Sequence, residues 1–493
     1  MSRKSGILLH ISSLPGPDGI GSMGKEAYAF ADFLAEAGMH IWQVLPLGPT
    51  GYGESPYQSA SVFAGNPMLI SLEKLKEDGL LRPVPREEEW VEPSNAAQVD
   101  FEAMKAHKLA MLRDSFFQSE DRLQKEISAF RREQPWVNDF ALFQALKKRF
   151  GNMMWTQWPD RAIRRRDPSA IARCKTELSD EVHFQIYCQY LFQRQWMELK
   201  KYCNSKGIEI FGDMPIYVAE DSADTWTHPE VFQLDRDGVP RRVAGVPPDL
   251  FSATGQLWGN PLYRWHRLRW RGYGWWVERM RRMKEMYDII RIDHFIGFAN
   301  YYSIPHGAAT AQTGKWVVGP GKHLFDTFKK KLPDLNIVAE DLGVVNDRVR
   351  ALLNYVGYPG MKVLTFGFGG GEDNPHRLTN FTQNSVAYTG THDNDTVLGF
   401  LSAADAATVE DARRLLGFKA LSEAPEAFCR AVMNSKSDTA VLSMQDVLGL
   451  DGTARMNFPS TIGGNNWKWR MLPGAADAAL ARRLRQWNQE AER

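Results

Sequence analysis

A short run of isoleucines in this sequence gives way, within a few positions, to residues that can do chemistry. The segment 287–295 places Arg291, Asp293 and His294 at the end of this apolar run. Such a run predicts a buried strand, whose side chains alternate between two faces. Arg291 and Asp293 then share one face, where both charges must be paired or lose their hydration. An ion pair that closes a strand would explain a single case, so a functional interpretation depends on repetition.

The same change from apolar to acidic residues ends three other runs, at 208–215, 336–343 and 386–395. These runs carry Asp213, Glu340 and Asp393. In a parallel barrel the carboxyl ends of the strands meet at one rim, and the active site lies there. An ion pair that merely closes a strand does not readily explain four such cases. The sequence therefore predicts an active site built from these carboxylates and Asp293.

Two carboxyl groups on either side of a sugar acetal can break it by double displacement. Asp293 is the candidate nucleophile, because Arg291 on the same face would keep it ionised by charge pairing and hydrogen bonding. Glu340 is the candidate acid/base. Partial burial and the like charge of Asp341 beside it would raise the pKa of Glu340 toward the protonated form that it needs.

Asp393 and His392 are candidates for binding the sugar hydroxyls and stabilising an oxocarbenium-like transition state. His392 alone could be a turn residue, and Asn394 and Asp395 could be turn formers. The functional interpretation is favoured because the group directly follows a strand-like run.

Eight strand-like segments occur along the chain, at 6–10, 40–46, 208–214, 288–293, 336–341, 361–366, 385–390 and 439–446. Amphipathic helical segments lie between several of them, at 25–37, 324–331, 346–355, 407–416 and 424–433. Strands that alternate with helices form βαβ units, and eight of them predict an α/β fold of the (β/α)8 barrel type. An open doubly wound sheet would normally have a glycine-rich turn after its first strand, where this chain has serine and Pro15.

The uneven spacing of the strands predicts a single catalytic barrel over 1–493 with large, mostly helical insertions. The first insertion, 48–205 between the second and third strands, is predicted to be mostly helical, with helices at 101–118, 123–132 and 181–201. The second insertion, 219–287, carries the segment 245–263. This segment is rich in Pro and Gly and lacks helical or strand periodicity, so it is predicted to be a long ordered loop.

Phe251 and Trp258 are the candidate substrate-binding residues of the segment 245–263. Their rings could stack on sugars, and prolines stiffen both ends of the segment. Packing of these aromatic residues on the barrel rim is the alternative, which the interleaving of polar and aromatic residues makes less favoured. We expect the segment to fold over the site, hold the acceptor in attack geometry and keep water out.

The charge of the chain is nearly balanced, with 60 Lys and Arg against 59 Asp and Glu. Neither nucleic acid nor an anionic membrane is therefore favoured as a partner. The four cysteines lack CxxC spacing, which argues against a zinc site or a disulfide framework and favours a cytoplasmic location. No apolar run could span a bilayer, and no signal-peptide pattern is found. Aromatic residues make up 12% of the chain, and several Trp have polar neighbours, as in sites that bind sugars.

Longer motifs run from one end of the chain to the other, at 6–15, 48–58, 212–218, 245–263, 291–295, 339–343, 391–396 and 454–457. Together they resemble the 4-α-glucanotransferases (amylomaltases or disproportionating enzymes), relatives of the α-amylases. After Asp213 the chain lacks the Asn-His pair of typical α-amylases, which favours the transferase branch. Position 250 is Leu where many relatives have Tyr.

The resemblance implies a retaining transferase that moves a segment of an α-1,4-glucan to the 4-OH of an acceptor through a covalent glycosyl-aspartate. It places the nucleophile at Asp293, the acid/base at Glu340 and the transition-state stabiliser at Asp393. The implied substrate-binding residues are Tyr57, Ser55, Asp213, Arg291, His294 and His392, with Tyr57 stacking on the glucose that becomes covalently bound. It implies no metal and no cofactor. The expected partners are an α-1,4-glucan or maltooligosaccharide donor and a glucose or maltooligosaccharide acceptor, and the expected state is a monomer or weak homo-oligomer.

Three other functions are compatible with parts of this pattern. An α-1,4-glucan hydrolase of the α-amylase type would use the same carboxylates. Enzymes that enolise a substrate on Mg²⁺ also place acidic residues at strand ends, but they need a Lys or His base, and no lysine follows the strands named above. A maltodextrin-binding protein could be equally aromatic, but it would not need a spaced nucleophile and acid.

Overall fold

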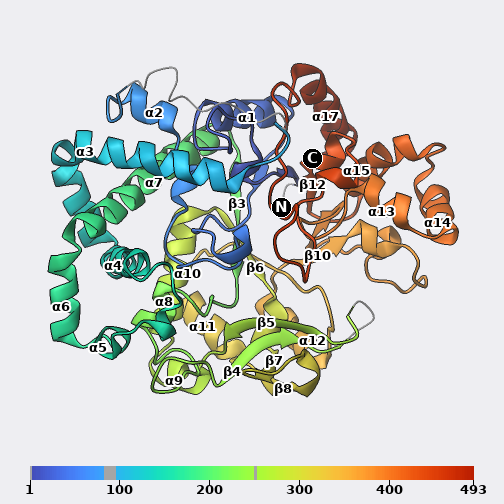
Figure 1. Cartoon of the computed structure of the whole chain (residues 1–493). Helices are drawn as coiled ribbons and strands as arrows, with labels where there is room; N and C mark the ends of the chain where they lie inside the picture. Colours follow the sequence, from blue (N-terminus) through green and yellow to red (C-terminus); the bar gives the residue numbers. More distant parts are fainter. Residues whose placement is uncertain (1–2, 83–95, 249–251) are drawn as a thin grey trace.

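The computed structural model of this chain contains a parallel eight-stranded sheet with helices around it (Figure 1). The structure describes residues 3–82, 96–248 and 252–493. The strands of the sheet are β1 (Lys4–Leu8), β2 (Ile41–Gln43), β3 (Glu209–Pro215), β6 (Ile289–Asp293), β9 (Ile337–Ala339), β10 (Gly360–Val363), β11 (Ser385–Tyr388) and β12 (Thr439–Ser443). Each overlaps one of the eight predicted segments.

The sheet closes on itself between its two outer strands. The strand order is β10-β11-β12-β1-β2-β3-β6-β9, and all neighbours are parallel. The Ala339 amide at the end of β9 donates to the Pro359 carbonyl before β10 at 2.9 Å. Nearby, the Met361 amide donates to Asp341 Oδ1 at 2.8 Å. The predicted (β/α)8 barrel is confirmed.

Apolar residues at both faces explain why these short strands are buried. Ile7, Ile41, Ile210 and Ile292 are each at most 1% exposed, and they belong to one continuous core. Residues on the barrel strands pack inward on each other and outward on the surrounding helices, as expected of a parallel sheet. The barrel is therefore a rigid frame for the side chains at its rim.

Helices between the strands and after the last strand cover the outside of the barrel. They are α1 (Lys25–Glu36), α10 (Gly274–Met286), α11 (Lys322–Lys331), α12 (Asp347–Val356), α13 (Val397–Ala403), α14 (Ala406–Leu416), α15 (Ala424–Asn434), α16 (Met444–Val447) and α17 (Ala478–Glu490). Local sequence sets their ends. Helix α12, for example, begins after Asn346, whose side chain accepts from two backbone amides, and ends at Gly357, whose φ is +71°.

A group of helices between β2 and β3 forms one side of the molecule in Figure 1. It contains α2 (Leu72–Glu77), α3 (Phe101–Glu133), α4 (Trp136–Arg149), α5 (Arg161–Arg164), α6 (Pro168–Glu177) and α7 (Ser179–Ser205). The prediction of two helices at 101–118 and 123–132 is wrong, because α3 is one helix of 33 residues. Residues 119–122, between the two predicted helices, are polar but include neither Gly nor Pro, so they do not end the helix. Among them, Ser119 donates to the Ser115 carbonyl at 2.7 Å within the helix.

A second, antiparallel sheet lies beside the barrel, with the strand order β5-β4-β7-β8. Its strands are β4 (Arg242–Val246), β5 (Gln256–Pro261), β7 (Asn300–Pro305) and β8 (Lys315–Val318), and the short helices α8 (Ala223–Thr227) and α9 (Trp265–Trp270) lie near it in the sequence. The prediction that 245–263 lacks regular structure is therefore wrong for its two ends. A register shift between Val243 and Gly245 breaks the local alternation, and β4 is held by β7 from far along the chain. Among the described residues, no helix is both long and apolar enough to cross a bilayer.

Candidate active site

Neighbouring strands β3 and β6 bring three charged side chains together at the carboxyl end of the barrel. Asp213 on β3 is paired in register with Arg291 on β6. Arg291 Nη1 donates to both oxygens of Asp213, each at 2.7 Å. The other guanidinium nitrogen, Nη2, lies 2.9 Å from Asp293 Oδ1. Arg291 and Asp213 are buried, whereas the Asp293 side chain keeps 28% of its surface exposed. Asp293 is therefore the accessible end of a buried ion network.

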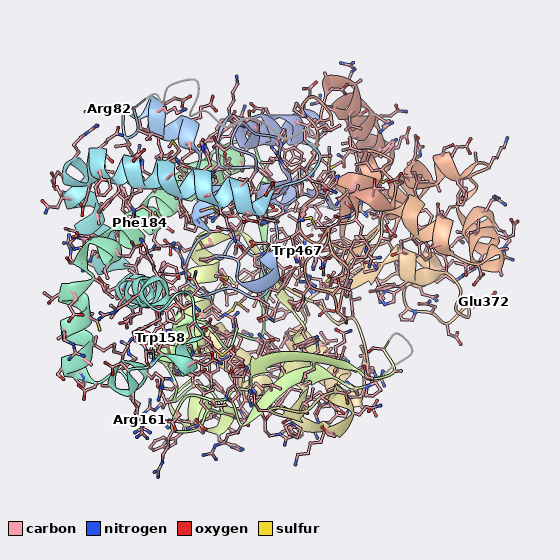
Figure 2. The ribbon with its side chains drawn as sticks, in the orientation of Figure 1. Arg82, Trp158, Arg161, Phe184, Glu372 and Trp467 are labelled. Atoms are coloured by element: carbon pink, nitrogen blue, oxygen red, sulfur yellow. The ribbon has the colours of Figure 1, made fainter. Side chains whose placement is uncertain are left out.

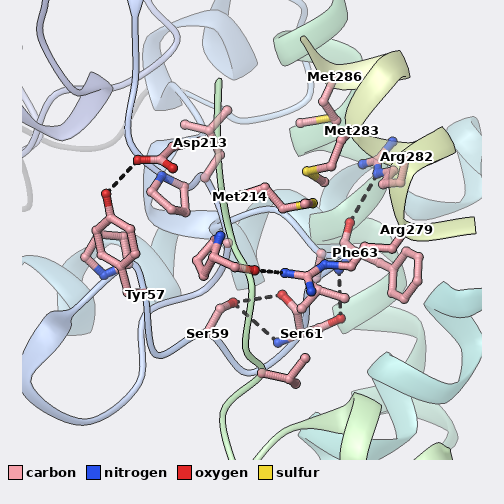
Figure 3. Close-up of a pocket in the computed structure, with 18 of the residues that line it drawn as sticks. Tyr57, Ser59, Ser61, Phe63, Asp213, Met214, Arg279, Arg282, Met283 and Met286 are labelled. Atoms are coloured by element: carbon pink, nitrogen blue, oxygen red, sulfur yellow. Dashed lines mark hydrogen bonds between the residues drawn. The ribbon is translucent and has the colours of Figure 1, made fainter. Parts of the chain in front are cut away.

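Tyr57 connects this network to the loop after β11. Its hydroxyl donates to Asp213 Oδ2 at 2.7 Å (Figure 3). Its ring stacks on His392 with a centroid distance of 4.9 Å and an interplanar angle of 18°. The ring of Trp467, labelled in Figure 2, lies 5.9 Å from both of these rings. An aromatic and imidazole surface thus borders the buried charges.

Glu340 follows β9 and is 6% exposed. Its Oε2 accepts the His294 amide at 2.6 Å, and its Oε1 accepts the Leu342 amide at 2.7 Å. Burial raises the pKa of Glu340 strongly; Arg291 opposes this shift and the charge of Asp293 adds to it. Burial also raises the pKa of Asp293, with Arg291 opposing. Because Arg291 contacts Asp293 directly, a proton shared by the two carboxyl groups belongs on Glu340.

His294 turns the chain immediately after Asp293, with a left-handed φ of +52°. Burial lowers the pKa of His294 to about 4, so the imidazole is neutral near pH 7. Trp258 on β5 meets the His294 ring edge to face, with 4.8 Å between the centroids. Trp258 therefore reaches the barrel rim beside Asp293 from the antiparallel sheet.

Asp393 lies in the loop after β11 and has a half-exposed carboxylate. Its Oδ1 accepts from Asn457 Nδ2 at 2.6 Å and lies 3.4 Å from His392 Nε2. The start of the loop is fixed by Asn394 Oδ1, which accepts the Thr391 amide at 2.8 Å. The structure thus places Asp393 beside His392, which in turn stacks on Tyr57.

Most of the residues predicted for the site belong to one set of contacts. They are Tyr57, Asp213, Trp258, Arg291, Asp293, His294, Glu340, His392 and Asp393. Ser55 is more peripheral: its Oγ accepts the Tyr57 amide at 3.3 Å, which shapes the loop that carries Tyr57. Phe251 lies outside the described residues.

Asn457 and Trp467 were given no role from the sequence, although both contact predicted site residues. Asn457 ends the motif 454–457, and Trp467 is one of the Trp residues with polar neighbours. The sequence thus contained a signal for each of these two residues. They could not be connected to the site because these residues contact Asp393, Tyr57 and His392 only in the folded chain.

Tyr57 and Asp213 also line a cavity of about 50 Å³ (Figure 3). Arg279 of α10 lines it and donates through Nη1 to the Ile216 carbonyl at 3.0 Å and through Nη2 to the Pro215 carbonyl. The buried guanidinium therefore fixes the backbone at the end of β3 and directly after it. Among the described residues, no three carboxylate, His or Cys side chains are grouped so that they could hold a metal ion.

Comparison with known proteins gives a consistent result over the whole chain. A family model described as 4-alpha-glucanotransferase matches residues 9–475. The chain is 48% identical to a 4-alpha-glucanotransferase of Streptococcus pneumoniae serotype 4 over 95% of this chain and 93% of that protein. It is 45% identical to a 4-alpha-glucanotransferase of Thermus thermophilus over 100% of this chain and 99% of that protein.

The similarity extends to a solved structure. An amylomaltase from Streptococcus agalactiae, determined in complex with acarbose, superposes with a TM-score of 0.96 at 40% identity, and the match covers 100% of this chain and 99% of that one. Sequence similarity over nearly the full length and the same fold lead to one conclusion. The chain belongs to the 4-alpha-glucanotransferase family.

Proposed function

We propose that this transferase moves a segment of an α-1,4-glucan to the 4-OH of an acceptor glucose or maltooligosaccharide, with retention at the anomeric carbon. The main support is the contrast between two carboxyl groups on adjacent strands. Burial raises the pKa of both groups, but Arg291 contacts Asp293 directly and favours its ionised form, while the charge of Asp293 raises the pKa of Glu340 further. This is the division between nucleophile and acid that double displacement requires.

In the first step, Asp293 attacks the anomeric carbon and forms a covalent glycosyl ester. The bond to the glycosidic oxygen breaks, and Glu340 gives its proton to that oxygen, so the leaving glucan departs with a free 4-OH. In the second step, the acceptor 4-OH gives its proton to the Glu340 carboxylate and attacks the same carbon. The ester bond to Asp293 then breaks, and both carboxyl groups return to their starting states.

Asp393 would stabilise the positive charge that develops at the anomeric centre. Its Oδ1 is engaged by Asn457, which leaves Oδ2 for a sugar hydroxyl. Tyr57 and His392 would form the surface against which the donor glucose packs. Asp213 has no exposed side-chain surface. We therefore propose that it assists substrate binding by holding Arg291 and Tyr57 in place.

Transfer must compete with hydrolysis, because water can also attack the covalent intermediate. Trp258, which packs on His294, the residue after Asp293, would exclude water and hold an acceptor ring. The rest of the segment 245–263, including Phe251, would help to exclude water and to hold the acceptor. A cytoplasmic location and a monomer or weak homo-oligomer remain predictions from the sequence.

Incubation of the pure protein with maltotriose tests the proposed reaction. A ladder of longer maltodextrins together with released glucose, separated by chromatography, is expected for transfer. Glucose and maltose alone would instead show an α-1,4-glucan hydrolase. Proton NMR of the first products should show newly formed α-linkages, and β-linked products would contradict retention.

A further inference from the structure

Arg455 lies beside the loop that carries Asp393, and its guanidinium group contacts two peptide carbonyls. Nη2 donates to the Asp393 carbonyl at 2.9 Å. Nε donates to the Asn457 carbonyl at 2.7 Å. The group also lies 4.5 Å from the ring centroid of Phe458, and Nη1 is 3.9 Å from Asp395 Oδ2. The side chain is 21% exposed, so these contacts are partly shielded from water.

The two carbonyls that Arg455 holds belong to residues whose side chains also bond to each other. Asn457 Nδ2 donates to Asp393 Oδ1 at 2.6 Å. Arg455 thus sets the spacing of the two backbones, and the side-chain bond then fixes the direction of the carboxylate. A guanidinium is planar and holds its N–H donors at fixed angles, which suits it to this double contact.

Asp393 needs such support more than the other two catalytic carboxylates do. Asp293 ends a barrel strand against Arg291, and both Glu340 oxygens accept backbone amides. The Asp393 side chain, in contrast, is 48% exposed and lies in a loop beyond the end of β11. Electrostatic stabilisation of a transition state depends on groups that are already in position, because reorganisation during the reaction has a free-energy cost.

We infer that Arg455 is a positioning residue, which raises the rate of glycosyl transfer by holding Asp393 and Asn457 in the geometry that stabilises the transition state. This inference rests on the proposed role of Asp393. Arg455 acts through Asp393 and not on the sugar, so its loss should lower kcat while KM for maltotriose stays nearly unchanged.

Two substitutions separate the parts of this contact. Arg455→Met keeps much of the packing on Phe458 but removes all the donors. Arg455→Lys keeps the charge, but its single ammonium group cannot reproduce the planar double contact. Both should lower kcat by about 10- to 100-fold, the range expected when a catalytic group is displaced by a fraction of an ångström to one ångström. Arg430→Met is the matched control, because Arg430 pairs with Glu490 on the outer helices α15 and α17, and its kcat should equal that of the wild type.

A double-mutant cycle with Asp393→Asn provides the readout that a merely structural role would not give. If Arg455 acts through Asp393, Arg455→Met should reduce kcat in the wild type but cause little further loss in the Asp393→Asn background. Additive losses in the cycle, or an unchanged kcat in Arg455→Met, would overturn the inference. Should Arg455→Met fail to fold, Arg455→Lys enters the same cycle with the same expectations.

The cycle also separates this inference from the proposed function. An unchanged kcat in Asp393→Asn alone would refute the role of Asp393, and the inference with it. A large loss in Asp393→Asn together with wild-type kcat in both Arg455 variants would refute only the role of Arg455. Asn457→Ala should show the same fall in kcat as Arg455→Met, because it removes the bond to the carboxylate itself.

Discussion

Arg291 lies 2.9 Å from Asp293 through one guanidinium nitrogen, while its other terminal nitrogen is bound to both oxygens of a buried aspartate, Asp213. The Asp213 carboxylate thus fixes the guanidinium group in a position from which it contacts the Asp293 carboxylate. This arrangement keeps a positive charge beside Asp293 even though burial raises the pKa of the Asp293 carboxyl. The ionised form of Asp293 therefore depends on Arg291.

The substitution Arg291→Lys should shift the acidic limb of the kcat/KM profile to higher pH. An ammonium group cannot contact Asp213 and Asp293 together as the guanidinium does. The charge beside Asp293 would weaken, the pKa of Asp293 would rise further, and a higher pH would be needed to ionise it. Kinetics with maltotriose over a range of pH measure this shift. Arg430→Lys is the control, and an acidic limb at the wild-type position would show that Arg291 does not keep Asp293 ionised.

Glu340→Gln should lower transfer from maltotriose by about 10²–10⁴-fold, because Gln has no proton to donate. The first step with a glycosyl fluoride donor should be spared, since fluoride leaves with little protonation. Asp293→Asn should lose activity with both donors. Equal losses in Glu340→Gln with the two donors, measured by released glucose for maltotriose and by released fluoride for the glycosyl fluoride, would contradict the acid/base role.

The pH dependence of the wild type should reflect the raised pKa of Glu340. The acid form survives to higher pH than in an exposed Glu, and activity on glucans falls only as the pH rises through this raised pKa. The basic limb should be absent from the first step with a glycosyl fluoride. Its persistence with that donor would assign the limb to a different group.

The substitution Trp258→Ala should raise the ratio of hydrolysis to transfer several-fold, because water gains access beside His294 and Asp293. Leu257→Ala is the matched control, since Leu257 is the neighbouring residue on β5 and is already 42% exposed. The ratio is obtained from released glucose and from the maltodextrin ladder in the same reaction. The same rise is predicted for Phe251→Ala. If Trp258→Ala and Phe251→Ala both keep the wild-type ratio, the segment 245–263 is not the water barrier.

Tyr57→Phe should lower the free energy of unfolding by about 1 kcal/mol, since it removes one hydrogen bond to a buried carboxylate that Arg291 still partners. It should also lower kcat/KM, because the Tyr57 ring that stacks on His392 would no longer be hydrogen-bonded to Asp213. Tyr355→Phe is the control: its hydroxyl also bonds an aspartate, Asp326, but on the exposed surface, where the bond contributes little. Urea denaturation should therefore separate the two variants, and equal stabilities would contradict the role of Tyr57.

The barrel and its main carboxylates could be predicted because their signals are local. A buried strand is a short apolar run, and Asp213, Asp293 and Glu340 end or directly follow such runs. Parallel closure then brings these ends together without further information. The strands β4 and β5 could not be predicted in this way, because a register shift interrupts their alternation and their partner β7 comes later in the chain.

Contacts between distant loops were the part of the site that the sequence could not predict. Asn457 reaches Asp393 across 64 residues, and Tyr57 reaches His392 across 335. Neither contact follows from the periodicity of a strand or helix. Each depends on how loops of the closed barrel meet, which becomes visible only in three dimensions.

The most direct test of the proposed mechanism is mass spectrometry of the Glu340→Gln variant after reaction with an α-maltosyl fluoride. The first step should proceed and the second should stall, because no carboxylate remains to deprotonate the acceptor. Proteolysis should then yield a peptide that carries the maltosyl group on Asp293. An adduct on a different residue, or fluoride release without any adduct when the reaction is quenched within a single turnover, would contradict a glycosyl-aspartate intermediate at Asp293.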